Sequence, residues 1–161
     1  MKNKINLIIR HYKPTDIEEV VNLFYNTVHS INTKDYTKAQ VNVWASKNID
    51  LDNWNKTLLK HHSFVVTNSF GKIIGFGDID STGYLDKLFV HKDFQNIGIA
   101  TLICDELEKI NTDIIFTYSS ITAKPFFEKR NYKVIKEQEV ECQGIKLKNY
   151  LMEKIKKRQD F

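Results

Sequence analysis

The sequence contains little cysteine and no long apolar run. Its 161 residues include only Cys104 and Cys142, which are too few for a disulfide framework and take part in no spacing typical of metal ligands. We therefore expect free thiols and no metal site. Nowhere do 18 apolar residues follow one another, and the first 13 residues lack an apolar run of signal-peptide length. The sequence thus predicts a cytoplasmic protein that does not enter a membrane.

No repeat, low-complexity segment or linker divides the chain. With 42% hydrophobic residues, the chain suits one domain, 1–161, that buries about two thirds of its unfolded surface. The net charge of +4 would suit a nucleic-acid partner, but the basic residues are spread along the chain. Their one dense run lies in 154–161, which we interpret as a solvated basic tail. We therefore do not expect nucleic acid as a partner.

The rest of the chain is organised around the segment 84–110. Tyr84 to Val90 is rich in aromatic and branched residues and is typical of a strand. From Ala100 to Ile110, apolar residues recur at steps of three and four, which predicts a helix with one buried face. Small residues lie where this helix opens, and the first amides of a helix have no partner within it. The pattern therefore predicts a site for an anionic, phosphorylated ligand.

The residues between this strand and helix form the pattern Gln95-x-x-Gly98-x-Ala100. The pattern contains neither G-x-G-x-x-G nor G-x-x-x-x-G-K-[ST]. It resembles the coenzyme A loop of the GNAT superfamily of acetyl-CoA-dependent N-acetyltransferases, [Gln/Arg]-x-x-Gly-x-[Gly/Ala]. A second signature of the family is similar to the run from Ser120 to Tyr132, which contains Ala123 followed by two phenylalanines. The resemblance covers residues 84–132.

The resemblance implies acetyl-CoA as co-substrate and transfer of its acetyl group directly to a primary amine of a small molecule or peptide. Amides of residues 95–101 would hold the diphosphate, and backbone N–H groups near the end of the strand would polarise the thioester carbonyl. The expected partners are acetyl-CoA and an amine of unknown identity, and a homodimer is left open. The predicted cofactor-binding residues are Phe89, Val90, Gln95, Asn96, Ile97, Gly98, Ile99, Ala100, Thr101 and Ser120.

An amine acceptor arrives protonated and must lose a proton before it can attack. If the strand is regular, Tyr84, Asp86 and Leu88 alternate onto one face, which makes Asp86 the first candidate for the catalytic base. Asp78 and Asp80 on the preceding strand are further candidates. A structural role, in which Asp86 pairs with Lys87 or with solvent, explains the residue equally well.

The thiolate that departs from acetyl-CoA needs a proton. Many family members supply it from a tyrosine at the position of Phe127, whose phenyl ring has no proton to donate. We predict Tyr118 as the substitute acid, against the alternatives that it only packs or that solvent supplies the proton. Ser120 stands where the family often has an asparagine that binds the cofactor arm, although its hydroxyl can instead cap the next helix. The missing tyrosine also leaves open a non-catalytic coenzyme A sensor or regulatory module.

The predicted fold belongs to the α/β (α+β) class. Strand, helix and strand over 84–119 form a parallel βαβ crossover, in a GNAT-like sheet that is otherwise mostly antiparallel and flanked by helices. Two glycines on one face of the preceding strand, Gly75 and Gly77, permit close approach by a neighbouring element. We interpret His61 and His62 as surface residues at a helix end. In the variable region 26–62, the aromatic face of Tyr36 and Trp44 is either core or a wall of the acceptor pocket.

Overall fold

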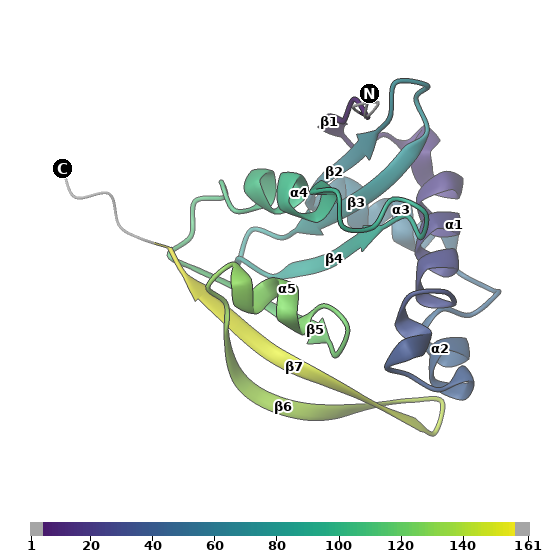
Figure 1. Cartoon of the computed structure of the whole chain (residues 1–161), viewed down its shortest axis with the longest axis vertical. Coiled ribbons are helices and arrows are strands. Elements are labelled where there is room, and N and C mark those ends of the chain that lie inside the picture. Colours follow the sequence, from purple (N-terminus) through teal and green to yellow (C-terminus); the bar gives the residue numbers. More distant parts are fainter. Residues whose placement is uncertain (1–4, 157–161) are drawn as a thin grey trace.

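The structure, a computed structural model, describes residues 5–156 (Figure 1). Two sheets, five α-helices and two short 3-10 helices (Pro14–Asp16 and Asn32–Lys34) make up the described chain. The helices are α1 (Ile17–Val28), α2 (Lys38–Trp44), α3 (Leu51–Lys60), α4 (Ile99–Leu107) and α5 (Lys124–Lys129). The strands are β1 (Ile8–His11), β2 (His62–Thr67), β3 (Ile73–Ile79), β4 (Leu85–Val90), β5 (Ile114–Ser120), β6 (Lys133–Cys142) and β7 (Ile145–Ile155).

The seven strands form two antiparallel sheets in the orders β1-β2-β3-β4 and β5-β7-β6. In Figure 1 the first sheet lies above the second. The crossover places β4 beside β5, and one parallel bridge, between Tyr84 and Phe116, joins them. The predicted parallel neighbours are therefore present, as is the mixed, mostly antiparallel architecture. The prediction of a single continuous sheet was incomplete, because the strands separate after this bridge.

Two hydrogen bonds hold β4 and β5 together at the closed end. The Phe116 N–H donates to the Gly83 carbonyl at 3.0 Å, and the buried Thr117 Oγ1 donates to the Leu85 carbonyl at 2.8 Å. Beyond these bonds, within residues 5–156, β4 pairs only with β3 and β5 only with β7. The result is a V-shaped opening whose two inner edges belong to strands that no third strand bridges.

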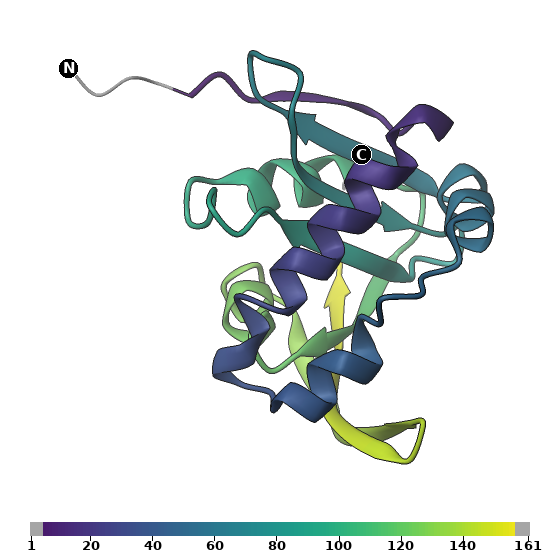
Figure 2. The ribbon, with the colours of Figure 1, turned by 90° about the vertical axis from the view of Figure 1, so that its right-hand side faces the viewer.

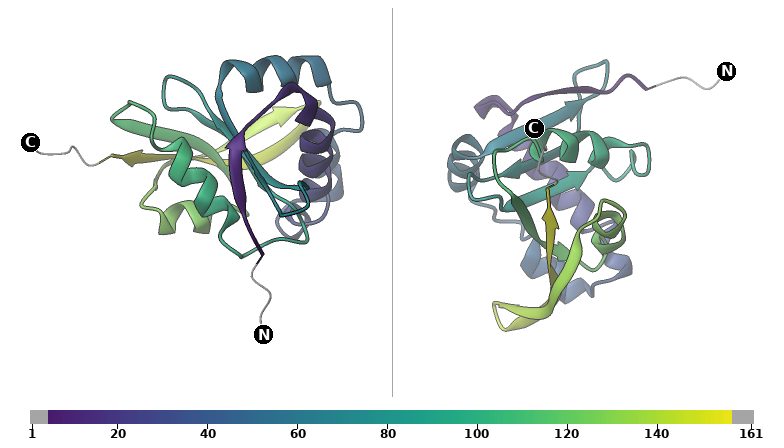
Figure 3. Two further views of the ribbon diagram at one scale, coloured as in Figure 1. Left: turned by 90° about the horizontal axis from the view of Figure 1, so that it is seen from above. Right: turned by 90° about the vertical axis from the view of Figure 1, so that its left-hand side faces the viewer.

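Helices cover both faces of the four-stranded sheet. Figure 2 shows α1 crossing one face, and the left view of Figure 3 shows α4 on the opposite side. The approach of α4 depends on two glycines of β3, as predicted: a Cβ on Gly75 would lie 2.4 Å from Ile99 Cγ2, and one on Gly77 would lie 2.9 Å from Ile103 Cγ2. These glycines therefore fix the height of α4, and of its N-terminus, above the sheet.

Aspartate carboxylates stabilise the N-terminal ends of the first 3-10 helix and of α3. Thr15 and Glu18 do not form a capping box; the Asp16 carboxylate instead accepts a hydrogen bond from the Lys13 N–H at 2.8 Å and one from Arg10 Nη1, also at 2.8 Å. A helix opening can use any nearby acceptor, and here a charged one with an arginine partner is available. In the same way the Asp50 carboxylate caps α3 by accepting a hydrogen bond from the Asn53 N–H at 3.1 Å.

The basic tail begins later than predicted. β7 continues to Ile155, and Lys154 forms an ion pair with Glu108 while its ammonium lies 5.6 Å from the centre of the Tyr132 ring. Lys156 donates to the Ile110 carbonyl. These lysines therefore tie β7 to α4 and its following loop, and residues 157–161 lie outside the described part. Within that part, no helix is long and apolar enough to cross a membrane.

Candidate active site

The loop before α4 exposes backbone amides. Asn96 and Gly98 have positive φ, 62° and 92°, which turns the chain sharply into the helix at Ile99. The first helical hydrogen bond runs from the Leu102 N–H to the Gly98 carbonyl at 3.0 Å. The amides of residues 99–101 therefore have no acceptor within the helix, as at any helix start. Together with the positive end of the helix dipole, they suit an anion.

The Gln95 side chain stabilises this loop through hydrogen bonds to its backbone. Its side-chain amide donates to the Val90 carbonyl at 2.8 Å and to the His91 carbonyl at 3.2 Å. The Thr27 hydroxyl donates to the same Val90 carbonyl at 2.9 Å. The glutamine side chain thus fastens the loop to the end of β4, so the geometry gives it a positioning role and leaves ligand contact to its neighbours.

A cleft of about 760 Å³ extends from this loop into the V-shaped opening. Ile97 and Ile99, two of the predicted cofactor residues, do not line it. Ile99 is 1% exposed and packs on β3, so only its backbone is available. The predicted residues that do line the cleft are Phe89, Val90, Gln95, Asn96, Gly98, Ala100, Thr101 and Ser120. Thr27 at the end of α1 also lines it, as do Asn32 and Lys34 of the following 3-10 helix, and no local pattern in the sequence marks them.

The edge of β4 that faces the opening carries N–H groups that do not pair with β3. The His91 N–H donates to the Ile74 carbonyl of β3 at 2.9 Å, and Phe89 is paired with Phe76 of the same strand. Because peptide groups alternate between the two edges of a strand, the N–H groups of Leu88 and Val90 point into the opening. We had predicted an oxyanion donor near Phe89 and Val90; the alternation favours Leu88 and Val90, and the Phe89 side chain packs among aromatic rings.

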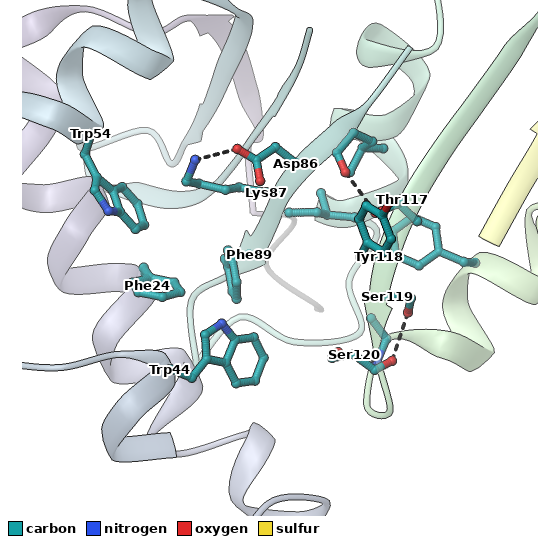
Figure 4. A pocket seen from close by; sticks show the side chains of 14 residues that line it. Phe24, Trp44, Trp54, Asp86, Lys87, Phe89, Thr117, Tyr118, Ser119 and Ser120 are labelled. Carbon is teal, nitrogen blue, oxygen red and sulfur yellow. Dashed lines mark hydrogen bonds and ion pairs between the residues drawn. The ribbon is translucent and has the colours of Figure 1, made fainter. Parts of the chain in front are cut away.

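A second cavity, of about 260 Å³, adjoins the cleft on the side of α1, α2 and α3 (Figure 4). It shares four lining residues with the cleft: Leu88, Phe89, Ser120 and Ala123. Aromatic rings from three helices form its outer wall, whereas Asp86, Lys87 and Tyr118 supply its polar groups. A ligand in the cleft and another in this pocket would therefore meet between β4 and β5.

A β-bulge sets the direction of Asp86. Lys87 pairs with Asp78, and the next pair along is Leu85 with Ile79, so Asp86 has no partner on β3. Leu85 and Leu88 consequently pack into the same core cluster beneath α4, while Asp86 lines the aromatic pocket. The predicted regular alternation, which placed Asp86 and Leu88 on one face, was wrong, because an extra residue shifts the period of a strand.

Asp86 belongs to a cluster of charged side chains. Lys87 Nζ lies 2.9 Å from Asp86 Oδ2 and 3.8 Å from Asp78 Oδ2, and His61 Nδ1 lies 2.8 Å from the same Asp78 oxygen. Asp78 is fully buried. Its hydrogen bond raises the pKa of His61, against the opposing effect of burial. His61 ends α3, as we had interpreted it, but it is partly buried and paired with Asp78 instead of lying free on the surface; an aspartate inside the apolar strand 73–79 was the sequence signal for this.

The same cluster contains the atoms that could ligate a cation. One atom each from His61, Asp78 and Asp86 lies within 4.8 Å of the others. The sequence had predicted no metal site, since no local ligand spacing occurs. In the structure the Lys87 ammonium contacts both carboxylates, so the positive charge of the cluster comes from the protein itself.

Tyr118, the candidate acid, and Phe127, at the position of the family's tyrosine, differ in exposure. Tyr118 lines the pocket with 44% of its surface exposed, and its ring centre lies 5.7 Å from that of Tyr84, whose hydroxyl reaches Asp86 Oδ1 at 3.2 Å. Phe127 is 3% exposed and also lines the pocket. The residue at the position of the family's tyrosine thus faces the pocket in this protein, but it is a phenylalanine and has no hydroxyl. Ser120 Oγ accepts the Ala123 N–H at 3.0 Å, so it stabilises the turn that leads into α5.

The aromatic face of the variable region divides between core and site. Tyr36 is buried; its hydroxyl donates to the Lys148 carbonyl at 2.6 Å and accepts from the Ile121 N–H at 3.0 Å. It therefore ties the segment before α2 to β7 and to the residue that follows β5. Trp44, in contrast, lines the pocket, which makes it the wall residue of the two.

Comparisons with known proteins agree with this geometry. Residues 32–154 match the family described as "Acetyltransferase (GNAT) domain". The chain is 31% identical over 147 residues to the uncharacterized N-acetyltransferase YafP of Escherichia coli (strain K12), covering 91% of this chain and 95% of that protein.

Solved structures give the same result. A GCN5-related N-acetyltransferase from Rhodopseudomonas palustris superposes with a TM-score of 0.88 at 26% identity, over 96% of this chain and 99% of that one. The PaiA N-acetyltransferase from Thermoplasma acidophilum, solved with coenzyme A, shares the fold with a TM-score of 0.73 at 16% identity, over 94% and 99%. The chain belongs to the GNAT family of N-acetyltransferases.

Proposed function

We propose that the protein transfers the acetyl group of acetyl-CoA directly to a primary amine of a small molecule. The observation that carries this proposal is the junction between the cleft and the aromatic pocket, which share Leu88, Phe89, Ser120 and Ala123. A coenzyme A molecule with its diphosphate on the α4 amides would extend its arm along β4, and an acceptor in the pocket would reach the thioester at the junction. Both substrates then react in one ternary complex.

Each step has a group to perform it. Asp86 takes a proton from the ammonium of the acceptor, and the freed nitrogen lone pair forms the C–N bond at the thioester carbonyl. The N–H groups of Leu88 and Val90 donate to the oxygen as negative charge develops there. The C–S bond then breaks, and the thiolate takes a proton from Tyr118. The attacking nitrogen loses its second proton as the amide forms, this proton restores the Tyr118 hydroxyl through solvent, and Asp86 returns its own proton to solvent. Acetyl-CoA and the ammonium are thus converted to amide, coenzyme A and one released proton.

The buried thiol supports direct transfer over an acetyl-cysteine intermediate. Cys104 lies on the core side of α4 with none of its surface exposed, and burial raises its pKa to about 12. A thiol with such a pKa supplies almost no thiolate at neutral pH, and the thiolate is the nucleophile. Both cysteines are free, in accord with the reducing cytoplasm that we propose as the location.

Release of coenzyme A thiol across a panel of primary amines tests the proposal. We expect intersecting initial-rate patterns, a large loss of kcat for Asp86→Asn, and at least a hundredfold loss for Tyr118→Phe with acetyl-CoA affinity unchanged, because general acids contribute about that much and act only in the transition state. A Tyr118→Phe rate within about threefold of wild type would exclude Tyr118 as the acid. Acetyl-CoA binding without thiol release for any amine would favour the alternative, a sensor module, to which the absent hydroxyl at Phe127 also points.

A further inference from the structure

The aromatic pocket is a preformed cavity that can hold an apolar group. Phe24 of α1 lies between Trp54 of α3 and Phe89 of β4, with ring centres 4.8 Å and 4.9 Å apart. Trp44 of α2 closes the wall 6.2 Å from Phe89, and Figure 4 shows these four rings gathered on one side of the pocket. The cavity of about 260 Å³ has room for roughly nine groups the size of a water molecule. Such a space suits a small hydrocarbon skeleton.

On one side of this cavity lies an ammonium group of the protein itself, that of Lys87. Lys87 Nζ lies 4.9 Å from the centre of the Trp54 ring and 2.9 Å from Asp86 Oδ2. A cation within about 6 Å of an indole face is attracted by the ring, more strongly where water is scarce. The Lys87 side chain is only 14% exposed. Trp54 and Asp86 therefore form a subsite that binds an alkylammonium, and the protein's own lysine fills it.

The charges around this subsite favour a cation over a neutral guest. Asp78 and Asp86 contribute two negative charges and Lys87 one positive charge. His61 pairs with Asp78 at 2.8 Å, so the carboxylate that faces the pocket is that of Asp86. Among residues 5–156, Asp86 Oδ1 accepts a hydrogen bond only from the Tyr84 hydroxyl, at 3.2 Å, and 27% of the Asp86 side chain is exposed. A second ammonium group can therefore approach Asp86 from the pocket.

We propose that the acceptor is a primary ammonium on a compact apolar body, and that its ammonium replaces that of Lys87 between Asp86 and Trp54. This proposal rests on the proposed function and names its substrate class. The proposal makes Lys87 a specificity-determining residue. The Lys87 ammonium occupies the subsite and excludes neutral molecules, and only a ligand with a positive charge of its own displaces it. The proposal also places the acceptor's ammonium against the carboxylate that removes its proton.

The two tryptophans of the chain, Trp44 and Trp54, both line this pocket, so their fluorescence reports binding without turnover. The probe is 2-phenylethylamine, titrated with saturating coenzyme A, which has no acetyl group to transfer. Its neutral isostere, 2-phenylethanol, and methylamine, which lacks the apolar body, are the matched ligands. We expect the phenylethylammonium to bind at least tenfold more tightly than either. If the wild-type protein binds the amine and the alcohol with equal affinity, this result alone overturns the proposal.

Variants of Lys87 test the replacement itself. Lys87→Met keeps the apolar stem and removes the ammonium, so we expect at least threefold tighter binding of the amine and no change for the alcohol. Lys87→Arg keeps a cation and should show no gain. In the double variant Lys87→Met/Trp54→Leu, binding of the amine should return to the wild-type affinity, with the fluorescence of Trp44 as the reporter. If the tighter binding came only from the change in net charge, it would persist in the double variant. A folded Lys87→Met variant with unchanged or weaker amine binding would overturn the proposal.

Failure here is distinguishable from failure of the proposed function. Amine binding with the predicted selectivity but no thiol release would refute the transferase mechanism and leave the ammonium subsite intact. Rapid acetylation of amines that show no such selectivity would refute the subsite and leave the transferase mechanism intact.

Discussion

Gly98→Glu offers a direct test of the α4 loop as the diphosphate site. Gly98 lines the cleft, has φ of 92°, and offers open space to an added Cβ, with no heavy atom within 4 Å. Glutamate should therefore fit sterically in the free protein, while it brings bulk and negative charge to the place where an anion must approach. We expect coenzyme A affinity to fall at least tenfold, about 1.4 kcal/mol.

The backbone strain of this substitution can be measured separately. A side chain in the left-handed region costs about 1–2 kcal/mol, which lowers Tm by about 2–8 °C in a chain of this length. Gly71 provides the matched control: its φ is 79°, an added Cβ there also meets nothing within 4 Å, and it lies in the β2–β3 turn away from both cavities. Gly71→Glu should lower Tm by a similar amount.

Calorimetric titration with coenzyme A, at a temperature where both variants are folded, separates the two effects. Gly71→Glu should bind coenzyme A like the wild type, and Gly98→Glu should not. Unchanged binding by a folded Gly98→Glu variant would refute the assignment of the diphosphate to this loop. An equal loss in both variants would show that strain, and not the location of the charge, weakens binding.

Two further predictions concern the chemistry and the charged cluster. Phe127→Tyr restores a hydroxyl at a buried ring that lines the pocket; we expect kcat to rise at least tenfold with acetyl-CoA affinity unchanged, and an unchanged kcat would show that this position does not reach the thiolate. Asp78 raises the pKa of His61, so the pair stabilises the fold fully below about pH 6.5, the unfolded value, and this contribution is lost as pH rises through the raised pKa. The difference in Tm between wild type and His61→Asn should thus be larger at about pH 5.5 than at about pH 9, and a constant difference would contradict the pairing.

The sequence was most informative where short segments determine the structure. The run from Tyr84 to Ile110 contains a strand, a turn that needs Gly98 and a helix with one apolar face, and each depends on near neighbours. Gly75 and Gly77 indicated close approach because no other residue leaves that space. The pattern Gln95-x-x-Gly98-x-Ala100 is also local, so the position of the loop between β4 and α4 could be predicted from it.

Features that depend on register between distant strands could not be predicted. The bulge at Asp86 arises from its pairing with β3, and one extra residue reverses which face a side chain occupies. The ion pair of His61 with Asp78 joins residues 17 positions apart, across a hairpin whose exact alignment the sequence does not specify. The wall of Phe24, Trp44 and Trp54 comes from three helices, so its existence depends on how they pack.

The opening between β4 and β5 also has a consequence for the folded state as a whole. Strand edges with free peptide groups are ordinarily found at the rim of a sheet, where they invite pairing with other chains. Here such an edge lies inside the molecule, between β4 and β5, and the outer rims belong to β1 and β6. A ligand that carries amide groups along an extended arm can complete this interior edge as an added strand would. Its binding free energy then adds to the free energy of unfolding, by about 2.7 kcal/mol at a hundredfold excess over Kd, and the resistance of this enzyme to heat and proteases becomes a function of how much coenzyme A surrounds it.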